Sequence, residues 1–131
     1  MSSKNSKQKK QYQDLLWEFN PSDNRVTLDG KTWKATTLFA KIKDLPVFDV
    51  PVAAIDLHWN VWNIKDIATF IRHVVSVNKA DLSYPIIFDE DGQLMDGYHR
   101  VCKAILENRK TIKAVRFKEN PAADIIEKED E

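Results

Sequence analysis

Apolar residues along the chain recur with two different periods, which predict separate helices and strands. Spacing of three or four residues, typical of amphipathic helices, occurs in three segments: 12–19, 64–78 and 98–106. Short apolar runs or strict alternation predict strands at 25–28, 31–35, 50–57, 86–88 and 111–117. The hairpin signal Asp91-Gly92 predicts a further short strand between that turn and Gly97. Residues 39–47 show neither period, and we interpret them as a short strand or an irregular link.

Turn and cap residues lie between these segments. Asp29-Gly30 predicts a two-residue hairpin turn, with Val26 and Leu28 on the face that Trp33 shares. Asn63 is the predicted N-cap of the helix at 64–78, and we expect His73 on the surface of that helix.

Two further local expectations concern the ends of elements. In the strand at 50–57, Ile55 and Leu57 are expected to point to different faces, and Asn108 is expected to end the helix at 98–106 in a left-handed conformation. Residues 120–131 are mainly acidic and are expected to be mobile, although Ile125 and Ile126 could dock as a helical turn.

Length and composition are those of one domain with tails. The 131 residues are 43% hydrophobic, with 20 basic and 20 acidic residues and a single cysteine. We divide them into a disordered basic tail (1–11), a helix and hairpin extension (12–49), a central domain (50–118) and an acidic tail (119–131). Zero net charge gives no general attraction to DNA. No apolar run reaches the ~20 residues of a membrane span, and the basic N-terminus lacks the apolar part of a secretory signal, so we expect a cytoplasmic protein.

The stretch Asp96-Gly97-Tyr98-His99-Arg100 lies where a predicted strand enters a predicted helix. The first turn of a helix attracts anions, because its N–H groups are unpaired and its dipole is positive there. Gly97 permits a tight turn and close approach of a ligand, Arg100 offers a planar donor fork, and His99 titrates near neutral pH. Asp96 could cap the helix, bind a metal or hold a basic side chain. The alternative is an ordinary turn with solvated side chains.

This stretch resembles the signature of the ParB/sulfiredoxin superfamily, in which a strand runs into a Gly-x-His-Arg helix start. The resemblance covers residues 50–117 and implies an α+β fold, a small mixed sheet with helices packed against it, here extended by the N-terminal helix and β-hairpin. ParB proteins bind CTP, sulfiredoxin binds ATP, and an archaeal serine kinase uses ADP; other members are described as nucleases. The resemblance implies that Gly97, Tyr98, His99 and Arg100 bind phosphate.

Two departures limit what the resemblance implies. Sulfiredoxin carries its catalytic cysteine where this chain has Tyr98, and Cys102 lies one helical turn farther on, so we do not expect sulfiredoxin chemistry. Only fourteen residues follow Phe117, too few for the DNA-reading region of partition proteins. We therefore do not expect chromosome partitioning.

The aromatic and polar loop at 58–63 is the second candidate region. In the resembling families this loop faces the nucleotide. Trp59, Asn60 and Asn63 could contact a base or substrate, as could Trp62, and Lys65 could reach phosphate; alternatively both tryptophans are core residues. Asp56, His58 and Asp96 are candidate catalytic groups by position only.

Three functions remain open from the sequence. The first is binding of a nucleoside di- or triphosphate, with NTPase or phosphotransferase activity as its enzymatic form. Mg²⁺ would be held by Asp96 or by an acidic loop residue such as Asp89 or Glu90. The second is a nuclease or DNA-binding factor. The third is a non-enzymatic interaction protein with a vestigial site. A homodimer is compatible with each.

Overall fold

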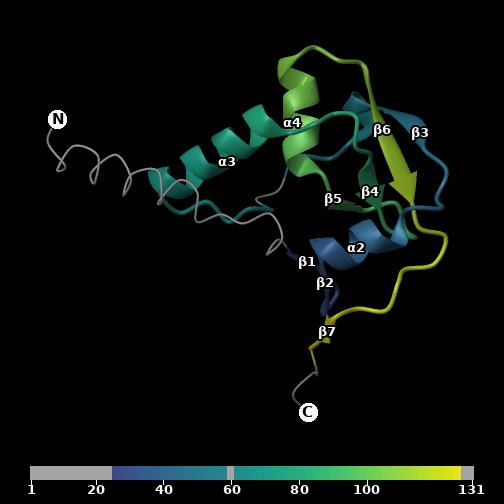
Figure 1. Cartoon of the computed structure of the whole chain (residues 1–131). Coiled ribbons are helices and arrows are strands. Elements are labelled where there is room, and N and C mark those ends of the chain that lie inside the picture. Colours follow the sequence, from purple (N-terminus) through teal and green to yellow (C-terminus); the bar gives the residue numbers. More distant parts are fainter. Residues whose placement is uncertain (1–24, 59–60, 128–131) are drawn as a thin grey trace, which may run out of the picture.

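The computed structural model describes residues 25–58 and 61–127. The predicted basic tail, the predicted helix at 12–19 and the loop residues Trp59 and Asn60 lie outside this part of the chain. The described elements, in order, are β1 (Arg25–Leu28), β2 (Lys31–Lys34), α2 (Ala35–Lys41), β3 (Phe48–Pro51), the 3-10 helix η2 (Val52–Ala54), α3 (Ile67–Lys79), β4 (Ile86–Phe88), β5 (Leu94–Asp96), α4 (Tyr98–Leu106), β6 (Thr111–Arg116) and β7 (Ile125–Ile126). They confirm the general α+β class (Figure 1).

A four-stranded sheet in the order β3-β6-β4-β5 forms the centre of the fold. β4 and β6 are parallel, and the chain passes from one to the other through β5 and α4, whereas the other neighbours are antiparallel. One face of this sheet packs against α4 and η2, where Ile86 and Val101 are fully buried.

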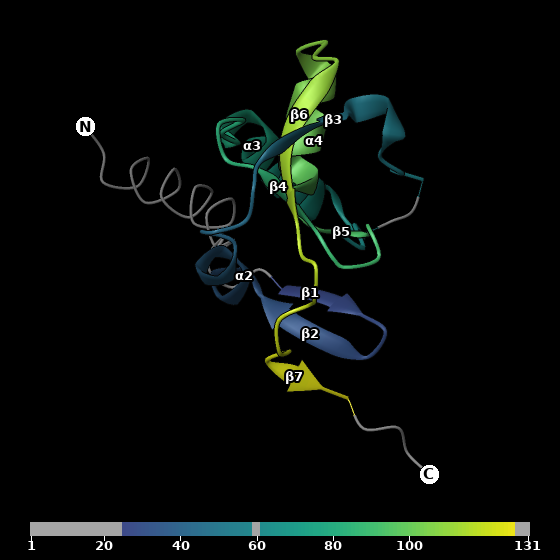
Figure 2. The same cartoon turned by 90° about the vertical axis from the view of Figure 1, so that its right-hand side faces the viewer.

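The N-terminal hairpin and α2 cover the opposite face of the central sheet. Adjacent residues of β4 point to the two faces, so Ile86 belongs to the α4 side and Ile87 to a second core cluster. In that second cluster Ile87 packs with Trp33 and Leu38 of the N-terminal part. Figure 2 shows β1, β2 and β7 side by side as a separate small sheet.

The predicted hairpin is confirmed in its turn and its register. Asp29 and Gly30 both have positive φ, 54° and 77°, as a two-residue turn between twisted strands requires, and Val26 lies opposite Trp33. The buried Trp33 ring donates its Nε1–H to the Pro121 carbonyl at 2.8 Å.

The segment after Phe117 is attached to this hairpin. Ile125 and Ile126 form β7, which pairs with β2, so the predicted helical turn is wrong. The Asp124 carboxylate accepts hydrogen bonds from the Lys34 N–H and the Thr37 hydroxyl. A strand forms because the outer edge of β2 offers backbone groups that need partners.

Two predicted strand boundaries are also wrong. The strand expected at 50–57 is β3, which ends at Pro51, and η2 then turns the chain so that Ile55 and Leu57 pack against one and the same core cluster. α2 occupies Ala35–Lys41, so Ala35 and the start of the segment at 39–47 are helical. Residues 42–47 form an irregular link, which was one of the two alternatives expected there.

The helix predicted at 64–78 begins later. Asp66, not Asn63, is its N-cap, because the Asp66 carboxylate accepts the Thr69 N–H at 2.7 Å, whereas Asn63 has a left-handed φ of 48°. His73 is 7% exposed, so the expectation of a surface residue is wrong. Within residues 25–58 and 61–127, no helix has the length and apolar character needed to cross a membrane.

Candidate functional site

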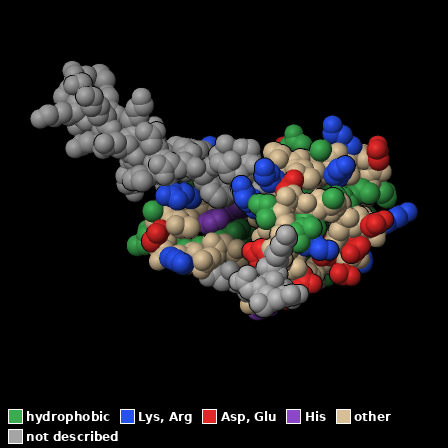
Figure 3. All heavy atoms as spheres, turned by 90° about the horizontal axis from the view of Figure 1, so that it is seen from below, with side chains coloured by type: hydrophobic (Ala, Val, Ile, Leu, Met, Phe, Trp, Pro, Cys, Tyr) green, Lys and Arg blue, Asp and Glu red, His purple; other side chains and the backbone are tan. Residues whose placement is uncertain are grey.

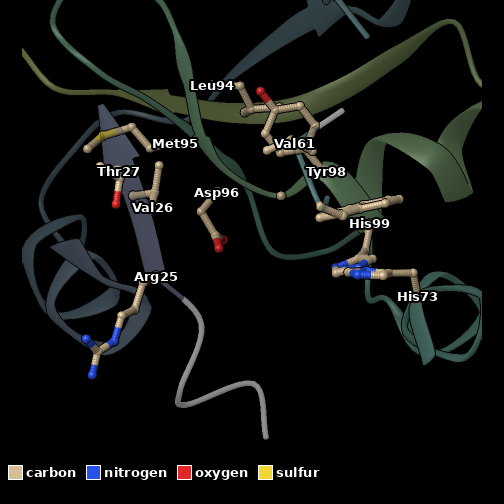
Figure 4. A pocket seen from close by; sticks show the side chains of 12 residues that line it. Arg25, Val26, Thr27, Val61, His73, Leu94, Met95, Asp96, Tyr98 and His99 are labelled. Carbon is tan, nitrogen blue, oxygen red and sulfur yellow. The ribbon is translucent and has the colours of Figure 1, made fainter. Parts of the chain in front are cut away.

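A pocket of about 400 Å³ lies between β1, the loop before α3, and the junction of β5 with α4. Its lining residues are Arg25, Val26, Thr27, Val61, Trp62, His73, Leu94, Met95, Asp96, Gly97, Tyr98 and His99. Figure 4 shows the Asp96 carboxyl group between the β1 residues on one side and the two imidazoles on the other. Four of the five residues of the predicted motif thus line one pocket, together with residues distant in sequence.

Gly97 forms the junction for a reason of packing. It has a φ of 114° and is the N-cap of α4, and a Cβ atom there would lie 2.5 Å from Cγ2 of Ile86. The glycine is therefore required by the contact with β4, whatever binds on the other side. Gly97 has no side chain with which to cap the first turn of α4, and Gly97, Tyr98 and His99 line the pocket.

Asp96 and Arg100 form an ion pair across one turn of α4. An Arg100 Nη lies 2.5 Å from an Asp96 Oδ, and the two side chains are 14% and 18% exposed, respectively. Burial raises the pKa of Asp96, and the Arg100 charge opposes that rise in part. Of the three predicted roles of Asp96, holding a basic side chain is confirmed. Arg100 does not line the pocket.

His99 and His73 form a second pair beside the first. His73 Nδ1 lies 2.7 Å from His99 Nε2, so one of these nitrogens donates and the other accepts. The ring centroids are 5.0 Å apart and the planes differ by 21°, so the imidazoles meet at their edges and lie nearly in one plane. Trp62 stacks on both, with centroid distances of 4.3 Å to His73 and 4.5 Å to His99.

Burial makes both imidazoles weak bases. It lowers the pKa of His99 to about 4, and the positive potentials of His73 and Arg100 add to the effect. Burial also lowers the pKa of His73, with a smaller contribution from Arg72. At neutral pH both imidazoles are therefore uncharged. The pair can donate and accept a proton, but it does not attract phosphate through a positive charge.

The other predicted site residues lie elsewhere. The exposed Asp56 and His58 contact each other: the carboxylate accepts the His58 N–H at 2.9 Å and lies 3.1 Å from Nδ1. These two hydrogen bonds lower the pKa of Asp56, and the bond from the His58 backbone N–H has the larger effect. Asn63 and Lys65 are exposed, and none of these four residues lines the pocket.

The acidic residues predicted to hold magnesium have structural partners. The Asp89 carboxylate is buried and accepts the N–H groups of Asp91 and Gln93 at 2.9 and 2.7 Å, which fixes the turn before β5. Glu90 accepts the N–H of Asn120. Among the described residues, no group of three or more His, Cys, Asp or Glu side chains could hold a metal. A metal role for Asp96 stays a prediction.

Arg25, Thr27 and His73 are pocket residues that sequence reasoning missed. His73 carried a usable signal, because it stands three residues after Phe70 and four before Val77, which is the spacing of one helix face. Arg25 and Thr27 carried none, since only the tertiary packing of β1 brings them to α4.

Comparison with known proteins leaves the family open. No protein-family model matches the chain, and no curated protein and no solved structure matches it either. The resemblance to the ParB/sulfiredoxin superfamily therefore stays a prediction.

Proposed function

We propose that the pocket at the start of α4 binds a small phosphate-bearing molecule, with a nucleotide as the class of ligand. The observation that carries this proposal is the convergence of the positive end of α4 and the exposed Arg25 on one pocket. Its volume of about 400 Å³ is in the range of small-molecule sites.

In this proposal the side chains of the motif have roles that differ from direct phosphate binding by Arg100 and His99. The phosphate lies at the first turn of α4 and is attracted by Arg25. Arg100 does not contact the phosphate. It pairs with the Asp96 carboxylate and neutralises the negative charge that would otherwise repel an anion. If the bound ligand reacts, the uncharged His73–His99 pair is the group suited to transfer a proton.

A nuclease or DNA-binding function has less support. Figure 3 shows basic and acidic side chains interspersed on the face that it displays, with a histidine in a hollow among them. DNA binding needs a surface on which basic side chains are concentrated.

Thermal unfolding tests the proposal, with ATP, ADP, CTP and GTP, each with Mg²⁺. A ligand at ~100 times its dissociation constant stabilises the native state by about 2.7 kcal/mol and raises the unfolding midpoint by several degrees. We expect such a shift for at least one nucleotide and its loss in Arg25→Glu.

Lys43→Glu is the matched control, because Lys43 is also exposed but does not line the pocket. It should retain the shift. The absence of a shift with all four nucleotides, or an equal loss in both variants, would contradict the proposal and favour an interaction protein.

A further inference from the structure

An apolar groove of about 340 Å³ runs between α3 and α4, beyond the pocket described above. Phe70, Val74 and Val77 line it from α3, and Cys102, Ile105 and Leu106 line it from α4. Phe70 is 51% exposed and Leu106 is 71% exposed. Large apolar side chains on both walls of one groove, left in water, indicate a surface that another segment covers.

The position of α3 explains why this surface is not covered by the rest of the described chain. α3 packs on α4 and buries only His73 and Val77. Figure 1 shows it extending away from both sheets. The face of α3 that includes Phe70 and Val74 is therefore bordered only by α4, and no other element of the described residues covers it.

We propose that residues 12–19 of the same chain bind in this groove as an amphipathic helix. In that segment Tyr12, Leu15, Leu16 and Phe19 have the spacing of one apolar helix face. Eight helical residues are about 12 Å long, close to the length of about 14 Å expected for the nine residues of α4. A short amphipathic helix in an apolar groove is a recurrent mode of recognition.

The start of the described chain lies within reach of the groove. Arg25 lines the pocket together with Trp62 and His73, and these two residues also line the groove. Residues 20–24 connect Phe19 to Arg25, and an extended link of this length spans up to about 20 Å. The segment can therefore reach α3 and α4 of its own chain, at a high effective concentration.

Cys102, the single cysteine of the chain, reports directly on occupancy of the groove. The test measures its rate of alkylation by iodoacetamide in the folded, full-length protein. Leu15→Asp/Leu16→Asp places two charges on the apolar face of the segment and should raise the rate about tenfold, which corresponds to a loss of ~1.4 kcal/mol of docking free energy.

Gln11→Asp/Gln13→Asp is the matched control, because it adds the same charge beside that face, and its rate should equal that of the wild type. Equal rates in all three proteins, or an equal rise in both variants, would overturn the proposal. The result does not depend on whether the pocket binds a nucleotide.

A disulfide distinguishes this chain's segment from that of a second copy. In Leu16→Cys, mild oxidation should link Cys102 to position 16 within one monomer, as seen by mass spectrometry of the peptides, since a disulfide needs Cα atoms within about 7 Å. Asp14→Cys, on the opposite side of the helix, should link much less. Links between two chains, or equal linking from both positions, would refute docking within the chain.

Discussion

Two of the three Asp-Gly pairs in this protein, Asp29-Gly30 and Asp96-Gly97, have the same local chemistry but are determined by different interactions. In Asp29-Gly30 both residues have positive φ, and apart from its chain neighbours no heavy atom of the described residues lies within 4 Å of a Cβ added to Gly30. In Asp96-Gly97 the glycine lies against Ile86 of β4, and the carboxylate pairs with Arg100. The first pair is determined by the backbone conformation of a hairpin turn. The second is determined by packing and charge interactions with residues outside the pair.

The largest expected difference comes from adding one methyl group to each glycine. Gly97→Ala should lower the free energy of unfolding by ~3 kcal/mol or more, because its Cβ overlaps Ile86 and its backbone is strained. Gly30→Ala should cost about 1 kcal/mol, for the left-handed backbone alone. Urea denaturation measures both, and similar losses would mean that the contact with Ile86 does not matter.

Removing the carboxylate charge should affect stability differently at Asp96 and at Asp29. Asp96→Asn leaves Arg100 buried without its partner and should cost about 3 kcal/mol, whereas Asp29→Asn should change stability by less than about 0.5 kcal/mol, since asparagine accepts a left-handed conformation. Replacing both partners, in Asp96→Leu/Arg100→Met, should recover much of the loss in the same denaturation assay. If the double variant is as unstable as the sum of its single changes, the two side chains are not coupled.

Lowering the pH should reduce the free energy of unfolding, because His99 is buried in its uncharged form beside His73. The folded pKa of His99, about 4, lies below the unfolded value of about 6.5, so the unfolded state binds more protons between these values. The stabilisation is complete above pH 6.5 and is lost as the pH falls toward 4. Partial exposure to solvent reduces the effect, and we expect a loss of about 1–2 kcal/mol between pH 7 and pH 4.5. The raised pKa of Asp96 acts in the opposite direction.

Urea denaturation at several pH values, with an NMR titration of the imidazoles, measures this effect. A His99 resonance that titrates near its ordinary value would show that the ring is not buried against His73 and Trp62.

Sequence reasoning succeeded where neighbouring residues decide the structure. The Asp29-Gly30 turn, the strands at 25–28 and 86–88, and the left-handed Asn108 at the end of α4 all follow from residue types and periods, and the structure confirms them. The spacing around Val101 predicted α4, and the motif predicted a strand-to-helix junction at Gly97. Such features are determined by backbone conformation within a few residues.

Other features were decided only by the tertiary structure. β7 exists because β2 presents an edge, and His73 is buried because α3 packs on α4. The candidate site is of this second kind: the motif named four of its residues, but His73 joins them from 23 residues before Asp96, and Arg25 from 71 residues before it, with Thr27 on the same strand. Local sequence determines conformation, whereas burial, and with it the pKa of His99 and the pairing of Asp96, depends on which distant surfaces meet.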